Sequence, residues 1–133
     1  MTTRGEMWQA EVLEVLHRHP APVTAYDVLT VLRETHEKLA PTTIYRALSA
    51  LTECGRVVRV ESLNAFLLRQ RGGQNQSSIL SICDECGTVE ENASPEVLEQ
   101  LSSVTSQSGF SPKRHVIEVH GVCESCSADK AQP

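Results

Sequence analysis

Residues 41–70, PTTIYRALSALTECGRVVRVESLNAFLLRQ, combine a helical pattern with a β-hairpin pattern. A helix is predicted to begin near Pro41, because proline is tolerated in the first turn. Its buried face would carry Ile44, Leu48 and Leu51, which recur at helical spacing. After Gly55 the apolar residues alternate over 57–60, residues 61–64 can turn, and residues 65–70 are predicted to form a return strand. The stretch therefore predicts a helix followed directly by a hairpin.

Two further helices are predicted before this stretch. Trp8, Val12 and Val15 recur at helical spacing, and Pro20-Ala21-Pro22 ends that helix. Thr24 has the position of an N-cap, with Asp27 three residues on in a weak capping-box arrangement. The buried stripe of this second helix is Ala25, Val28, Leu29 and Leu32. Three helices followed by a hairpin form the plan of a winged helix-turn-helix domain.

The second half predicts a strand–strand–helix–strand order. Strands are expected over 78–82, 87–91 and 114–120. A helix over 95–108 would have Ser94 as its cap and Gly109 at its C-terminal end. Its predicted buried face is Val97, Leu98, Leu101 and Val104. The fold class is therefore α+β, with a winged helix-turn-helix domain over 1–72, a small α/β domain over 73–126 and a disordered tail over 127–133.

Composition and charge separate the two halves. The 133 residues carry a net charge of −5, which by itself argues against a nucleic-acid binder. Residues 1–72 have a net charge of +1, however, and residues 73–133 one of −6. Only the first half could approach phosphate closely. The chain shows neither an apolar run long enough to span a bilayer nor the apolar core of a signal peptide, so a cytoplasmic protein without a membrane partner is expected.

Four cysteines form two Cys-x-x-Cys knuckles, Cys83 with Cys86 and Cys123 with Cys126. Two such turns can complete the tetrahedron of a Zn²⁺ ion, and each pair follows a predicted strand. The alternatives are a redox dithiol or two disulfides. A thioredoxin-like dithiol should open a helix within a βαβ unit, and that context is missing here. A cytoplasmic setting keeps thiols reduced, which argues against disulfides. We therefore predict one structural zinc per chain. Cys54 is interpreted as an inert, partly buried thiol.

The helix predicted from Pro41 also carries the candidate DNA-reading face. Thr42, Arg46 and Ser49 project opposite Ile44, and Tyr45 lies on the flank. Thr42 and Thr43 can donate to phosphate near the helix N-terminus, and Arg46 can reach guanine in the major groove. An ordinary surface helix could show the same residue types. The hairpin strengthens the DNA interpretation, because it adds candidate phosphate contacts at Arg56, Arg59, Arg69 and Arg71.

These motifs together resemble the ferric uptake regulator (Fur) family. The resemblance is carried by residues 41–48 (PTTIYRAL), by residues 23–29 (VTAYDVL) and by both knuckles, and it spans roughly residues 8–126. Residues 115–123 (HVIEVHGVC) and 60–62 (VES) most resemble the zinc uptake regulator (Zur) branch. The resemblance implies a homodimeric metalloregulator of metal-homeostasis genes, interpreted as a repressor, in which residues 1–72 form the DNA-binding domain and residues 73–126 the dimerisation domain. It also implies a hinge near Gly72-Gly73, base reading by Tyr26 and Arg46, and a pseudo-palindromic double-stranded operator.

The sequence departs from the family pattern in two places. Few residues precede the helix that contains Trp8, so a DNA contact from an additional N-terminal helix is expected to be reduced or absent. The regulatory metal site at the hinge would draw its ligands from the positions of Val58, Arg69, Gln76 and Glu91. Of these only Glu91 is a metal ligand. His115 matches a ligand of a third family site whose other positions, Ser77 and Ile79, are not ligands.

These departures define the alternatives. Arg69 would repel a divalent cation and could instead pair with Glu91, which gives the hypothesis of a fixed hinge and metal-independent DNA binding. A second alternative is a protein-interaction adaptor that has lost DNA binding. Glu91 and His115 remain candidate ligands of a second, regulatory metal. His17, His19 and His36 are interpreted as solvated surface residues. An enzyme is not expected, because neither a nucleophile–base pair nor an open metal position is apparent.

Overall fold

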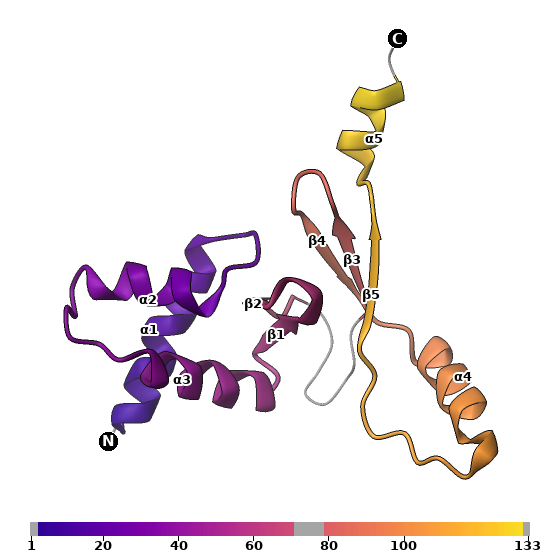
Figure 1. The fold of residues 1–133 in the computed structure, drawn as a ribbon, viewed down its shortest axis with the longest axis horizontal. Coiled ribbons are helices and arrows are strands. Elements are labelled where there is room, and N and C mark those ends of the chain that lie inside the picture. Colours follow the sequence, from indigo (N-terminus) through magenta and orange to yellow (C-terminus); the bar gives the residue numbers. More distant parts are fainter. Residues whose placement is uncertain (1–2, 71–78, 132–133) are drawn as a thin grey trace. The chain divides into compact units, whose positions relative to one another are not determined.

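The computed structural model describes residues 3–70 and 79–131, and the chain divides into two compact units (Figure 1). The first unit ends at Gln70 and the second begins at Arg71, within the Gly/Gln/Asn/Ser-rich stretch 71–78. That stretch, which includes Arg71 and Gln76, lies outside the described residues. Within the described ranges no helix is long and apolar enough to cross a bilayer.

Three helices build the first unit: α1 (Arg4–Arg18), α2 (Ala25–Arg33) and α3 (Pro41–Glu53). Thr24 caps α2 with a complete capping box. Its hydroxyl accepts from the Asp27 N–H at 3.0 Å, and Asp27 accepts from the Thr24 N–H at 3.0 Å. The box satisfies two backbone donors that a helix start leaves unpaired. Pro41 occupies the first turn of α3, as the sequence predicts.

The hairpin follows α3 as β1 (Val57–Val60) and β2 (Ala65–Leu68), joined by the short 3₁₀ turn η1 (Glu61–Leu63). Gly55, at φ 83°, provides the left-handed residue that ends α3. The strands are antiparallel, with Val57 opposite Leu68 and Val60 opposite Ala65. Val23 extends this small sheet, because its backbone exchanges hydrogen bonds with Phe66 at 2.9 and 2.7 Å. The wing is thus joined to the segment that leads into α2.

A continuous apolar core fixes the orientation of α3. Ile44, Leu48 and Leu51 are almost completely buried and pack with Val12 of α1 and Val28 of α2. Burying such side chains contributes about 1.5–3 kcal/mol each. One face of α3 is therefore held against the core, and the other faces solvent. This confirms the winged helix-turn-helix architecture.

The second unit contains a three-stranded sheet in the order β4-β3-β5. Its strands are β3 (Ile79–Cys83), β4 (Val89–Asn92) and β5 (Ile117–Gly121). β4 runs antiparallel to β3, whereas β5 runs parallel to it and places Cys83 opposite Gly121. The third strand begins three residues later than the sequence predicts, so residues 114–116 precede it. The end of β3 and the end of β5 consequently lie side by side.

Helix α4 (Pro95–Thr105) begins at the predicted cap, since the Ser94 hydroxyl accepts from the Val97 N–H at 3.4 Å. It continues into the 3₁₀ turn η2 (Ser106–Ser108), and Gly109 follows at φ 86°. The prediction of a buried face was wrong for the single chain, because no residue of α4 is buried and Val104 is 64% exposed. Figure 1 shows α4 beside the sheet rather than stacked as a layer over it. Among the described residues of the second unit, the apolar face of α4 thus has no covering layer.

The C-terminal residues also differ from the prediction. We expected a disordered tail over 127–133, but α5 (Glu124–Ala131) includes most of it. The helix begins in the second knuckle, where the Ser127 N–H donates to the Cys123 carbonyl at 2.8 Å. Closing that first turn on an ordered knuckle overcomes the initiation cost that leaves short isolated helices unfolded.

Candidate metal centre and nucleic-acid interface

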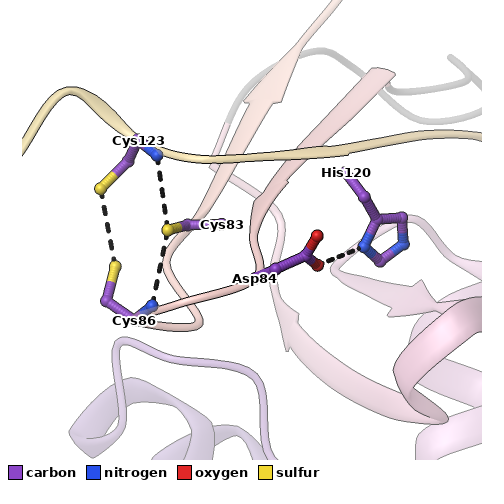
Figure 2. A network of polar contacts seen from close by, with 5 residues as sticks. All are labelled: Cys83, Asp84, Cys86, His120 and Cys123. Carbon is purple, nitrogen blue, oxygen red and sulfur yellow. Dashed lines mark hydrogen bonds and ion pairs between the residues drawn. The ribbon is translucent and has the colours of Figure 1, made fainter. Parts of the chain in front are cut away.

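The two knuckles place four sulfur atoms in one cluster at the ends of β3 and β5. Figure 2 shows those of Cys83, Cys86 and Cys123. One possible ligand atom from each of Cys83, Cys86, Cys123 and Cys126 lies within 4.8 Å of the other three. Cys83 is buried, Cys86 is exposed, and the other two are half-buried. The sulfurs of Cys86 and Cys123 are 3.6 Å apart. The two Cys-x-x-Cys motifs therefore form a single site.

This donor set fits zinc. Tetrahedral Zn–S bonds of about 2.3 Å separate neighbouring sulfurs by about 3.8 Å, close to the spacing found between the knuckles. All five cysteines of the chain are free thiols, so the cluster is not a pair of disulfides. Four thiolates fill every position of a tetrahedral ion and leave none for a reactive water. Bound zinc would thus hold the two knuckles together without supplying catalytic chemistry.

The backbone around the cluster favours thiolates at two of the four positions. The N–H groups of Cys123 and Cys86 both point at the Cys83 sulfur, at 3.4 Å, and lower the pKa of Cys83 to about 6. The Thr88 hydroxyl, 3.1 Å from the Cys86 sulfur, lowers the pKa of Cys86. The neighbouring Cys123 sulfur instead raises the pKa of Cys126, because the Cys126 thiol keeps its proton in a hydrogen bond to that sulfur, and burial adds to the effect. A bound divalent cation would replace that proton, because zinc binds cysteine as the thiolate.

A second pair of side chains joins the knuckles from outside the sulfur cluster. His120 Nδ1 lies 2.8 Å from a carboxylate oxygen of Asp84 (Figure 2). Beside it, the Asp84 N–H donates to the Gly121 carbonyl at 2.9 Å. Sequence reasoning missed this pair and the contact of Thr88 with Cys86. The available signal was position, since Asp84 lies inside the first knuckle and His120 three residues before the second.

The solvent side of α3 carries the candidate DNA-reading residues. Thr42, Tyr45, Arg46 and Ser49 are exposed, and Thr43 is half-buried. Tyr45 is 54% exposed, and Tyr26, near the start of α2, is 73% exposed. Tyrosines this exposed bury little apolar surface within the chain, so packing does not explain them. The exposed side chains of α3 and Tyr26 are thus available to contact a ligand bound to the first unit.

The wing arginines differ in their surroundings. Arg59 donates to the Asn64 side chain at 2.9 Å and forms an ion pair with Glu61 at 3.3 Å. Asn64 adopts the left-handed conformation at φ 48°, so this contact braces the turn of the wing. Arg59 is therefore held at the wing tip, whereas Arg56 and Arg69 form a backbone hydrogen bond at the base of the hairpin. Arg71 lies outside the described residues.

The structure does not bring Glu91 and His115 into a metal cluster. Glu91 is buried on β4. His115 Nε2 contacts the Ser102 hydroxyl of α4 at 3.0 Å. Among the residues that the structure describes, the four cysteines form the one group of three or more metal-binding side chains. A regulatory site that uses Glu91 or His115 stays a prediction.

Cys54, His19 and His36 each make a contact within the first unit. Cys54 lies outside the cluster, is half-buried and donates to the Leu51 carbonyl at 3.4 Å, as an inert thiol would. His19 contacts the Val15 carbonyl at 2.8 Å. The prediction of a solvated His36 was wrong. Its ring is half-buried and stands edge-on to Trp8, with centroids 5.0 Å apart, because the turn after α2 folds back onto α1.

A winged-helix unit joined to a unit with four clustered thiols is the arrangement of a DNA-binding regulator that carries a structural metal site. The model of the ferric uptake regulator family matches residues 7–120. The chain belongs to the ferric uptake regulator family.

Relatives and solved structures agree with this assignment. The chain is 38% identical over 117 residues to the zinc uptake regulation protein of Escherichia coli (strain K12). The aligned residues cover 87% of this chain and 68% of the relative. A structure of a zinc uptake regulator complexed with zinc and DNA is similar at a TM-score of 0.89 and 34% identity, over 98% of this chain and 86% of that one. The structure of holo XcZur gives a TM-score of 0.84 and 36% identity, over 96% and 86%.

Proposed function

We propose that this protein is a homodimeric, metal-responsive transcription regulator that binds a specific double-stranded DNA sequence and holds a structural zinc on its four cysteines. The observation that carries this proposal is the exposed face of α3, with Thr42, Tyr45, Arg46 and Ser49, in a chain that resembles a DNA-bound zinc uptake regulator over 98% of its length. It is not an enzyme, since the family consists of regulators and a four-thiolate zinc has no open position.

The arrangement of α3 supports base reading by Arg46. A guanidinium can donate two hydrogen bonds to one guanine in the major groove. Tyr26 lies at the start of α2, the helix that precedes α3. Its exposed side chain supports a second base contact, in addition to that of Arg46. Thr42 and Thr43, in the first turn of α3, can donate to phosphate and position the helix. Arg59 at the tip of the hairpin can contact a DNA phosphate if it gives up its ion pair with Glu61.

The exposed apolar face of α4 supports the homodimer. Val97, Leu101 and Val104 would remain in water in a monomer. Exposed apolar residues that share one helix face indicate a protein interface. A two-fold dimer would present two copies of α3 and would therefore read a pseudo-palindromic operator. Because the bacterial chromosome lies in the cytoplasm, we place the protein there.

Metal response distinguishes this proposal from its alternative, a family member that regulates without sensing metal. The kinship with zinc uptake regulators favours the metal-responsive form. We expect one zinc per chain to survive mild chelation, held by the cysteine cluster. We also expect added zinc to raise the affinity for operator DNA. Equal affinity in chelator and in added zinc would contradict metal response while leaving DNA binding intact.

Sequence-specific DNA binding can be tested by mobility shift. A duplex selected by the wild-type protein from a random-sequence library serves as operator, and a scrambled duplex of the same composition serves as control. Arg46→Lys should weaken operator binding by about 10- to 100-fold, because lysine cannot form the bidentate contact. Binding to the scrambled duplex should change little. If the wild-type protein selects no sequence, the adaptor alternative is favoured instead.

A further inference from the structure

An open groove with a volume of about 1000 Å³ lies in the first unit, beside the face of α3 described above. Arg4 and Trp8 of α1 line it, and so does Lys38, in the turn before α3. Thr43 and Arg46 of α3 also line it. Figure 1 shows the amino end of α1 close to the amino end of α3. The groove is thus continuous with the candidate base-reading surface.

The walls of this groove are held in place by contacts within the first unit. The edge-on pair of Trp8 and His36 joins α1 to the turn after α2. Arg33 Nε donates to the Leu39 carbonyl at 3.0 Å, and the Leu39 side chain is buried. These contacts fix the segment that carries Lys38. A groove shaped before binding loses little conformational entropy when a ligand enters.

The electrostatics of the groove favour an extended anion. Arg4, Lys38 and Arg46 are exposed cations on its lining, against Glu34 and Glu37. The amino end of α3 adds partial positive charge, and no side chain of the described residues caps it. Glu34 and Glu37 would repel a compact polyanion. A nucleic-acid strand presents its charges one phosphate at a time along the groove.

We propose that this groove holds the phosphodiester backbone of the bound DNA, with Arg4 and Lys38 as phosphate contacts adjacent to the base-reading Arg46. The inference rests on the proposed DNA-binding function and extends the interface to residues outside α3 and the wing. Phosphate contacts position a protein on the duplex and carry no sequence information themselves. Arg4 and Lys38 therefore contribute to affinity for operator and for unrelated DNA alike.

The test measures binding of the full-length dimer to the selected duplex and to the scrambled duplex over a range of salt concentrations. Arg4→Ala and Lys38→Ala should each weaken binding to both duplexes by about 3- to 10-fold and lower the magnitude of the salt slope by about 1 per protomer. Glu37→Gln should instead tighten binding to both, because it removes a negative charge from the groove.

Arg18→Ala is the matched control. Arg18 lies at the other end of α1, about 21 Å away at 1.5 Å per residue, and pairs with Glu14. Its substitution removes the same charge from the same helix but should leave affinity and salt slope almost unchanged. Equal effects of Arg18→Ala and Lys38→Ala would overturn the groove as a binding surface. So would a loss confined to the selected duplex, which would indicate base reading.

The inference and the proposed function fail in different ways. If the wild-type protein binds the selected duplex and the Arg4 and Lys38 variants bind it equally well, only the groove assignment is wrong. If the wild-type protein selects no duplex from the library and does not bind a scrambled one, both the DNA-binding function and the groove assignment are wrong.

Discussion

The sulfur atoms of Cys86 and Cys123 lie 3.6 Å apart, although 37 positions separate the two residues along the chain. The parallel pairing of β3 with β5 creates this proximity, because each strand leads directly into one knuckle. Closing so long a loop is costly in the unfolded chain, and a metal ion that bridges its ends can offset that cost. The cluster therefore couples metal binding to the folding of the second unit.

Substitution of one ligand should uncouple the knuckles. Cys86→Ser is expected to reduce the zinc content from about one per chain to a small fraction, because three thiolates do not complete a structural site. Metal analysis of the purified protein measures this. Cys54→Ser is the matched control, since Cys54 lies outside the cluster and should leave the zinc content unchanged. Full zinc in the Cys86→Ser protein would mean that the metal lies elsewhere.

The contact of Asp84 with His120 should slow the loss of metal. Asp84→Asn weakens the link between the first knuckle and β5, and we expect about tenfold faster zinc release to a chelator. Stopped-flow chelation with a coloured indicator measures the rate. Glu124→Gln is the control, because it removes the same charge from the second knuckle and is not part of this contact. Equal release rates for the two variants would show that only net charge matters.

The exposed face of α4 should be the dimer contact. Val104→Glu places a carboxylate on that face, and its desolvation should raise the dimer dissociation constant by about 100-fold. Sedimentation equilibrium measures the constant. Ser103→Glu adds the same charge on the opposite side of α4 and should leave the dimer intact. A stable dimer in the Val104→Glu protein would place the interface on another surface.

The capping box of α2 should stabilise the first unit. Thr24→Ala removes the side-chain half of the box and is expected to lower the free energy of unfolding by about 1 kcal/mol. Denaturant unfolding monitored by the fluorescence of Trp8 reports on this unit. Thr30→Ala is the control, because the Thr30 hydroxyl is exposed and donates to the Tyr26 carbonyl within α2, away from the helix start. A change within about 0.5 kcal/mol is expected. An equal loss in Thr30→Ala would show that the effect is not specific to the capping box.

Much of the first unit could be predicted because its signals are local. The spacing of Ile44, Leu48 and Leu51 indicates one buried helix face, and Thr24 with Asp27 marks the start of a helix. The change of period after Gly55 predicts the hairpin. The half-buried position of His36 could not be predicted, because it depends on how the turn after α2 packs against Trp8.

The sequence by itself determined the ligand set of the metal centre, because a two-residue gap between cysteines directs both sulfurs to one ion whatever surrounds them. It also determined that one face of α4 is apolar. Only the tertiary structure decided that this face stays exposed among the residues described and that Asp84 contacts His120. The physical reason is range. Periodicity and motif spacing act within a few residues, whereas strand register and layer packing join residues that the chain keeps far apart.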